Sequence, residues 1–274
     1  MIPLKLGIST CPNDTFIYEA LVKGIPGSPF QWDVSFADVQ TLNEKVMHGE
    51  LDVAKVSCGV LPRISDEYRL LSCGGAMGYG CGPLLLSSGM RGFENSIETV
   101  LPGKDTTASL LFRFWFSKIS PDSGHPKESY AFFNEVYEGL CSKIFSQGVV
   151  IHEHRFTWKR DGLVLLADLG AFWEENTHYP IPLGCSVAKK SLCLEWISLV
   201  EDEIRKSLDL AYARKELVSD FIRKKAQIAD DEIIEKHIRM FVTDFSRDIG
   251  DMGRNSLKVL FEFFPESESC CKKK

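Results

Sequence analysis

The stretch Gly74-Gly75-Ala76-Met77-Gly78-Tyr79-Gly80-Cys81-Gly82-Pro83 holds five glycines in ten positions. Such backbone freedom suits a bend between two lobes or a close approach of the chain to a ligand. A second connector, Pro180-Ile181-Pro182-Leu183-Gly184, is rigid and extended. Two such connectors predict a middle lobe inserted into an outer one. We therefore expect residues 1–83 and 200–274 to form the first lobe and residues 84–199 the second, with a ligand cleft between them.

Strand and helix patterns alternate on both sides of the first connector, which predicts an α/β fold with largely parallel sheets. Residues 15–23 follow the first strand as a helix, and Asn13 or Asp14 is the expected N-cap. From residue 192 to 258 the pattern is almost entirely helical. The strands that matter for the site are predicted at residues 4–9, 32–37, 51–56 and 148–151.

The composition indicates a globular protein with a real core and a small-molecule partner. The chain has 274 residues, of which 44% are hydrophobic, and a net charge of −6. This balance argues against nucleic acid as the partner, because phosphate backbones need a clustered basic surface. The basic end, residues 272–274, is interpreted as a solvated tail.

The same composition argues against a membrane protein or a metal site. No apolar run reaches the roughly 18 residues of a membrane span. The N-terminus lacks the pattern of an export signal, so a cytoplasmic location is expected. The nine cysteines form no CxxC pair, which predicts free thiols and no zinc site.

Three turns share one plan, in which an apolar strand is followed by a short polar turn and a helix start. They lie at residues 9–15, 55–59 and 104–107. Such turns lie at the carboxyl ends of strands, where α/β proteins bind ligands. Unpaired helix N–H groups and the hydroxyls of Ser57, Thr106 and Thr107 would hold a carboxylate or a polyol. For any single turn, a plain N-cap is the alternative; the occurrence of three favours binding.

His152 directly follows the buried run Val149-Val150-Ile151. A histidine at such a strand end can accept and return a proton near neutral pH, and the alternative is a structural histidine. If the strand continued, Glu153 would point to the opposite face and His154 would share the face of His152. The remaining histidines are predicted to be surface residues: His48, His125, His178 and His237.

Several familiar chemistries lack their motifs. The chain has no GxSxG nucleophile elbow, no Walker-type loop and no GxGxxG after a strand. We therefore expect neither a nucleotide cofactor nor a metal.

Seven motifs occur in an order that closely resembles the 1,4-dihydroxy-6-naphthoate synthases of the futalosine route to menaquinone. The resemblance runs from about residue 4 to about residue 190 and weakens through the helical C-terminal part. The motifs are Ser9-Thr10-Cys11-Pro12-Asn13-Asp14-Thr15-Phe16, Asp38-Val39-Gln40-Thr41-Leu42-Asn43, Leu51-Asp52-Val53-Ala54-Lys55-Val56-Ser57, Gly78-Tyr79-Gly80-Cys81-Gly82-Pro83, Pro102-Gly103-Lys104-Asp105-Thr106-Thr107-Ala108, Val150-Ile151-His152-Glu153 and Pro180-Ile181-Pro182-Leu183-Gly184.

The resemblance implies the bilobal fold of type II periplasmic binding proteins, used by a cofactor-free lyase. The implied substrate is cyclic dehypoxanthinyl futalosine, cleaved to the dihydroxynaphthoate and dihydroxyacetone. His152 matches the family's general base. The implied substrate-binding residues are Asn13 in the first motif, Lys55, Val56 and Ser57 in one turn, and Thr106, Thr107 and Ala108 in another.

Two segments depart from the family pattern and leave alternatives open. Residues 58–63 are unlike the usual aromatic- and histidine-containing stretch, and residues 176–179 replace a turn that normally contains glycine. One alternative is a protein of the same fold that only captures a small anion or polyol. Another is the related chorismate dehydratase. A homodimer is also left open.

Overall fold

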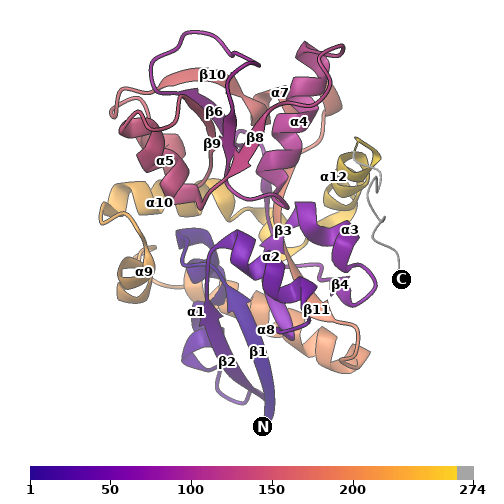
Figure 1. The fold of residues 1–274 in the computed structure, drawn as a ribbon. Helices are drawn as coiled ribbons and strands as arrows, with labels where there is room; N and C mark the ends of the chain where they lie inside the picture. Colours follow the sequence, from indigo (N-terminus) through magenta and orange to yellow (C-terminus); the bar gives the residue numbers. More distant parts are fainter. Residues whose placement is uncertain (264–274) are drawn as a thin grey trace.

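The computed structural model describes residues 1–263 as two lobes, each built on one β-sheet (Figure 1). The basic tail at residues 272–274 and two cysteines, Cys270 and Cys271, lie outside the described residues. Among the described cysteines, the predicted free thiols are confirmed at Cys11, Cys58, Cys73, Cys81, Cys141, Cys185 and Cys193.

The first sheet has the strand order β2-β1-β3-β11-β4, and β5 also pairs with β11. β1 runs parallel to β2 and β3, whereas β11 runs antiparallel to β3, β4 and β5. The strands are β1 (Ile2–Ile8), β2 (Phe30–Phe36), β3 (Val53–Ser57), β4 (Tyr68–Leu70), β5 (Ala76–Gly78) and β11 (Ile181–Lys189).

The second sheet has the order β10-β6-β9-β7-β8. β7 is parallel to β8 and β9, and β6 is antiparallel to β9 and β10. The prediction of largely parallel sheets is therefore wrong, because the strands that enter and leave the inserted lobe run against their neighbours. The strands are β6 (Leu84–Ser87), β7 (Thr99–Leu101), β8 (Glu128–Tyr130), β9 (Gln147–Val150) and β10 (Val164–Asp168).

Two connections join the lobes at the predicted connectors. The first leads from β5 to β6 through Gly80, whose φ of 67° needs glycine, and Gly82. A Cβ on Gly82 would lie 2.2 Å from the Cα of Gly170 and 3.0 Å from Cδ1 of Ile181, so the first connection packs closely against the start of the helix at residues 169–177 and against the second connection. β6 starts at the expected limit of the second lobe, but β11 pairs within the first sheet. We therefore propose that the second lobe ends between α7 (Leu169–Thr177) and β11 rather than at residue 199.

The helices cover both faces of each sheet. Helix α1 (Pro12–Lys23) starts at Cys11 with proline at its first position, so the prediction of Asn13 or Asp14 as N-cap is wrong. The other helices are α2 (Val39–Met47), the 3₁₀ turn η1 (Cys58–Val60), α3 (Leu61–Ile64), α4 (Thr107–Ile119), α5 (Phe133–Cys141), α6 (His154–Thr157), α8 (Leu194–Tyr212), α9 (Asp220–Lys225), α10 (Asp231–Phe241), α11 (Asp244–Arg247) and α12 (Gly250–Phe263).

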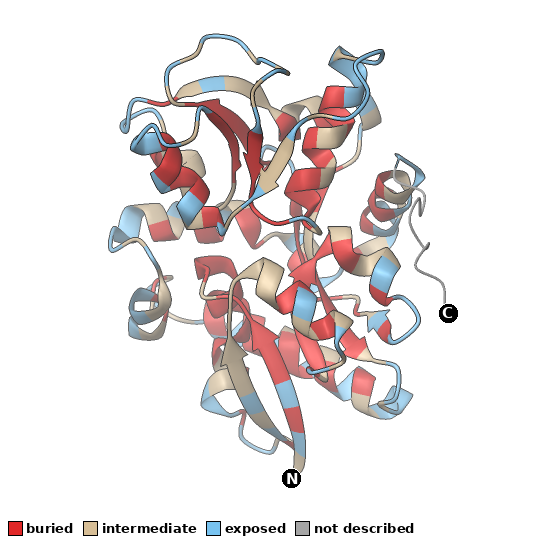
Figure 2. Ribbon diagram, in the orientation of Figure 1, coloured by how far each residue is buried: buried red, intermediate tan, exposed pale blue. Residues whose placement is uncertain are grey.

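One hydrophobic core runs through both lobes. It joins Leu42 of α2 to Phe112 of α4, Trp173 of α7 and Leu257 of α12. Separate cores lie under α1 and α8 in the first lobe and under α5 in the second. Figure 2 shows this buried layer beneath an exposed outer surface. The shared core packs the lobes against each other, and some of its members, among them Leu42, Val56 and Ala108, also line the cavity between the lobes.

None of the helices within residues 1–263 combines the length and apolar character of a membrane span.

Candidate active site between the lobes

A cavity of about 700 Å³, counted with its open mouth, lies where the two lobes meet. The structure brings together around it every residue that the sequence analysis assigned to the site: Asn13, Lys55, Val56, Ser57, Thr106, Thr107, Ala108 and His152. They belong to α1, to the end of β3, to the start of α4 and to the turn after β9. Their individual roles stay predictions.

Ser57 and Thr107 form a direct contact across the lobes. The Thr107 backbone N–H donates to Ser57 Oγ at 2.7 Å, and the two hydroxyl oxygens lie 3.1 Å apart. Thr107 Oγ1 also lies 3.1 Å from the carbonyl oxygens of Pro182 and Leu183. Both hydroxyls are therefore already engaged within the protein, which differs from the expectation of free donors.

Thr106 acts as the N-cap of α4. Its hydroxyl donates to the carbonyl of Gly103 at 3.0 Å and accepts from the N–H of Ser109 at 3.3 Å. The Thr106 side chain is therefore an ordinary N-cap, which was the alternative to a ligand-binding role. The N–H of Ala108 makes no hydrogen bond within residues 1–263. That N–H, at the positive end of α4, is the group left to meet a ligand.

A buried ion pair forms one wall of the cavity. Lys55 Nζ lies 2.7 Å from Asp14 Oδ1, and both side chains are about 5% exposed. Asp14 also accepts from Ser9 Oγ at 2.7 Å and from Asn13 Nδ2 at 2.8 Å. Gly184 of β11 pairs with Ser57 of β3 and lies next to this lysine. A Cβ added to Gly184 would lie 3.1 Å from Lys55 Cε. Glycine there gives the lysine room to reach Asp14.

His152 lies in the turn after β9 with a φ of 58°, an uncommon conformation for a residue other than glycine. Its ring faces the edge of Phe133 at 5.0 Å on one side and lies parallel to His237 at 5.9 Å on the other. Burial lowers the pKa of His152 to about 4, although Asp14 acts in the opposite direction. The imidazole is therefore neutral at neutral pH and able to accept a proton.

The prediction that His237 is a surface residue is wrong, because its side chain is fully buried against Asn13 and Phe241, two residues that line the cavity. His237 lies on the apolar face of α10 with Ile234, Ile238 and Phe241. That spacing of three, four and seven residues is the signal that could have shown its burial. Burial lowers the pKa of His237 well below its usual value. The other three histidines predicted to lie at the surface, His48, His125 and His178, are exposed.

β9 ends at Val150, before His152, so the condition for Glu153 and His154 to alternate along a strand is not met. Glu153 is 2% exposed, and burial raises its pKa. His154 instead begins α6 and stacks on Tyr137 with ring centres 3.8 Å apart.

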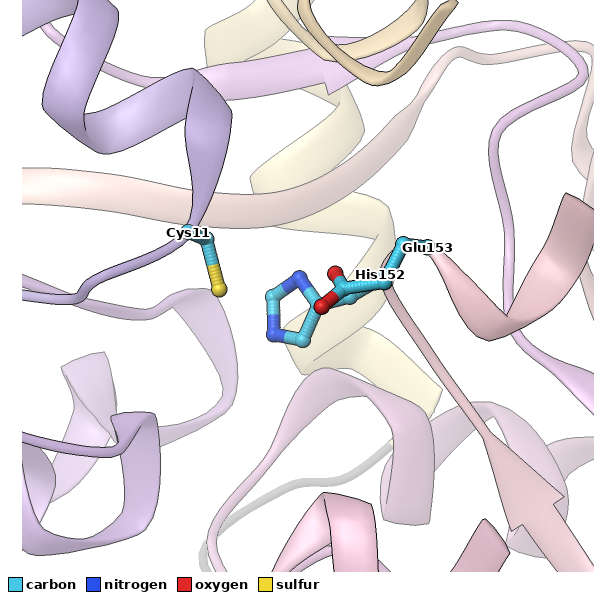
Figure 3. Close-up of side chains that lie close together, drawn as sticks. All are labelled: Cys11, His152 and Glu153. Carbon is cyan, nitrogen blue, oxygen red and sulfur yellow. The ribbon is translucent and has the colours of Figure 1, made fainter. Parts of the chain in front are cut away.

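Cys11, His152 and Glu153 converge beside the cavity (Figure 3). The Cys11 sulfur, a ring nitrogen of His152 and a carboxyl oxygen of Glu153 lie within 4.8 Å of one another. These are ligand types that a divalent metal accepts. However, burial holds the pKa of the Cys11 thiol well above its usual value, and Glu153 faces His237. Since a thiol binds metals as its thiolate, we assign this group no metal.

Two further residues of the site were missed by the sequence interpretation. Asp14, expected as a cap, is the acceptor for Lys55 described above. Asn43 on α2 accepts from the Ser57 N–H at 3.0 Å and donates to the carbonyl of Asp105 at 3.1 Å. Its amide ties the end of β3 to the loop before α4. An asparagine on the buried face of a predicted helix is the signal that could have drawn attention to it.

The fold is the bilobal α/β fold that periplasmic binding proteins share. A crystal structure from Archaeoglobus fulgidus matches with a TM-score of 0.88 at 23% identity, covering 95% of this chain and 96% of that one. The alkanesulfonate-binding protein of Xanthomonas axonopodis pv. citri, solved with bound MOPS, matches with a TM-score of 0.67 at 13% identity. The match covers 88% of this chain and 84% of that one. The predicted bilobal fold is confirmed.

Within that fold class, the chain belongs to the menaquinone biosynthesis family, whose model matches residues 4–266. It is 38% identical over 258 residues to the 1,4-dihydroxy-6-naphtoate synthase of Streptomyces coelicolor, covering 94% of this chain and 91% of the relative. The protein of the same name from Thermus thermophilus is 36% identical over 261 residues, covering 95% of this chain and 93% of the relative. The family predicted from the ordered motifs is confirmed.

Proposed function

We propose that this chain is a lyase that converts cyclic dehypoxanthinyl futalosine to 1,4-dihydroxy-6-naphthoate and dihydroxyacetone. The observation that carries the proposal is the convergence of the predicted base and the predicted binding turns on one cavity, in a chain of the menaquinone biosynthesis family. The two relatives named as naphthoate synthases favour this reaction over chorismate dehydration.

In this proposal His152 removes a proton from the substrate. Because burial lowers its pKa to about 4, the ring is unprotonated at working pH. A carbon–carbon bond then breaks, and formation of the second aromatic ring supplies driving force. The enclosing lobes exclude water during these steps. Neither an organic cofactor nor a metal has a step in this scheme.

The substrate carboxylate would bind at the start of α4. The N–H of Ala108, which has no partner in the described part of the chain, and the helix dipole favour negative charge there. The Ser57–Thr107 contact would hold this helix start in position rather than donate to the substrate. Lys55, neutralised by Asp14, would offer its remaining N–H bonds to a sugar-derived oxygen.

The test is incubation of the purified protein with the cyclic futalosine derivative, followed by mass spectrometry for dihydroxynaphthoate and dihydroxyacetone. Formation of both products in equal amounts supports the lyase. Binding of the substrate without product would favour a binding protein, like the alkanesulfonate-binding protein of Xanthomonas that shares this fold. The cytoplasmic location and the homodimer stay predictions.

A further inference from the structure

Two buried polar atoms face each other behind the proposed base. Glu153 Oε2 lies 3.6 Å from His237 Nδ1, just beyond hydrogen-bond distance, and neither atom has a hydrogen-bond partner within residues 1–263. Both side chains are almost completely buried. A buried polar atom without a hydrogen-bond partner destabilises the fold, so a proton shared between these two atoms is favoured.

The tautomer of His237 follows from the residues on its other side. The Asp14 carboxylate accepts from the Lys55 ammonium and from Asn13 Nδ2, which directs Asn13 Oδ1 toward His237. That oxygen lies 2.9 Å from His237 Nε2, so Nε2 carries the hydrogen. In a neutral ring Nδ1 is then the acceptor, and the donor it faces is the carboxylic acid of Glu153.

We propose that Glu153 and His237 form a positioning pair for His152, in which neutral Glu153 donates its proton to Nδ1 of His237. The ring fixed in this way lies parallel to the His152 ring, at 16° and 5.9 Å. This inference rests on the proposed role of His152 as the base. The raised pKa of Glu153 and the lowered pKa of His237, both caused mainly by burial, agree with it.

The pair would act on His152 through charge and orientation. His152 becomes a cation when it accepts the substrate proton, and a second cation on the parallel ring would oppose that step. A donor at Nδ1 keeps His237 neutral and holds its ring plane. The other titratable groups around these residues are Cys11, Asp14, Lys55 and His154, of which Asp14 and Lys55 neutralise each other.

The test compares Glu153→Gln with Glu153→Met. The amide of glutamine can still donate to Nδ1 and cannot ionise, whereas methionine has similar length and no donor. We expect Glu153→Gln to keep kcat within about threefold of the natural protein and Glu153→Met to lose roughly 10- to 100-fold in kcat with KM little changed. A loss of tenfold or more with glutamine would overturn the neutral-acid assignment. Full kcat with methionine would overturn the positioning role.

Nitrogen NMR of histidine-labelled protein tests the pair without any turnover. The signals of His237, assigned by their loss in His237→Gln, should be those of a neutral ring protonated at Nε2, in the natural protein and in Glu153→Gln. A ring protonated at Nδ1, or at both nitrogens, at neutral pH would overturn the proposal. Failure of the proposed reaction is separate, because it would appear as absent product while this spectrum kept its expected form.

Discussion

The backbone N–H of Thr107, the first residue of α4, donates to the hydroxyl of Ser57, the last residue of β3, at 2.7 Å. This bond joins the inserted lobe to the outer lobe at the edge of the cavity, together with the contacts of the Thr107 hydroxyl to Ser57, Pro182 and Leu183. The Asn43 amide bridges the same two segments beside it. The relative position of the two lobes at the site is therefore set by buried, directional contacts as well as by the shared hydrophobic core.

Gly59 permits this close approach, and we expect Gly59→Ala to weaken substrate binding. A Cβ on Gly59 would lie 2.9 Å from both the carbonyl carbon of Thr106 and the nitrogen of Thr107, so the start of α4 must move away. Overpacking of this kind costs about 1–3 kcal/mol, which corresponds to a rise in KM of roughly 5- to 150-fold. Steady-state kinetics measures it. Gly92→Ala is the control, since nothing lies within 4 Å of its Cβ.

His152→Ala should abolish turnover while leaving substrate binding largely intact. Loss of a general base typically reduces the rate by roughly 10²- to 10⁴-fold, whereas the binding turns on β3 and α4 are untouched. Single-turnover kinetics and calorimetric titration with the substrate separate the two effects. The control is His48→Ala, which removes an exposed histidine at the end of α2. Near-normal turnover of the His152 variant would show that another group is the base.

The positions of the site residues could be predicted from sequence because strand ends and helix starts are local features. The turns at residues 55–59 and 104–107 each combine an apolar strand with a polar helix start, and the fold brings both to the same cavity. What local pattern could not supply was pairing across the chain. The Thr106 hydroxyl caps its own helix and the Thr107 hydroxyl bonds to β11, so neither is the free donor that the sequence suggested.

The direction of β11 and the burial of His237 show the same limit. An extended run such as Pro180-Ile181-Pro182 indicates a strand or connector but carries no information on its partner, and the chain returns antiparallel to β3. His237 lies in a helix whose outer face is charged, and its environment depends on Asn13 and Glu153, which are distant in sequence. The family resemblance was needed to overcome the alternative of a structural histidine at residue 152.

Acid should destabilise the protein through His152 and His154. Burial lowers the pKa of His152 and of His154 to about 4, whereas both would titrate near 6.5 in the unfolded chain. The unfolded chain therefore binds more protons between these values. The free energy of unfolding is unaffected by these histidines above pH ~6.5. It decreases as the pH falls toward 4, by up to about 3 kcal/mol for each histidine. The raised pKa of Glu153 has the opposite effect on stability: its contribution is lost as the pH rises above the ordinary pKa of a glutamate.

His154→Phe isolates one of these contributions. Both ring nitrogens of His154 are buried and have no hydrogen-bond partner among residues 1–263, and phenylalanine keeps the stacking surface for Tyr137. Urea unfolding between pH 7.5 and 4.5 should show a smaller decline in the free energy of unfolding for the variant than for the natural protein. Parallel curves would mean that His154 does not contribute to the acid sensitivity.

The buried pair of Lys55 and Asp14 should show strong coupling in a double-mutant cycle. Lys55→Met leaves the Asp14 carboxylate buried with only the donors from Ser9 and Asn13, so we expect a loss of about 3–5 kcal/mol in the free energy of unfolding.

Asp14→Asn alone leaves the ammonium of Lys55 buried without its counter-ion, and a similar loss is expected. The double variant Lys55→Met with Asp14→Asn removes both charges and should recover at least half of either loss, because no unpaired charge remains. Urea unfolding of the four proteins gives the coupling free energy. Lys189→Met with Asp52→Asn, at a pair 3.4 Å apart that is about one quarter exposed, is the matched control and should show coupling below about 1 kcal/mol. Additive losses at Lys55 and Asp14 would mean that solvent reaches the pair and that its charge is open to the substrate.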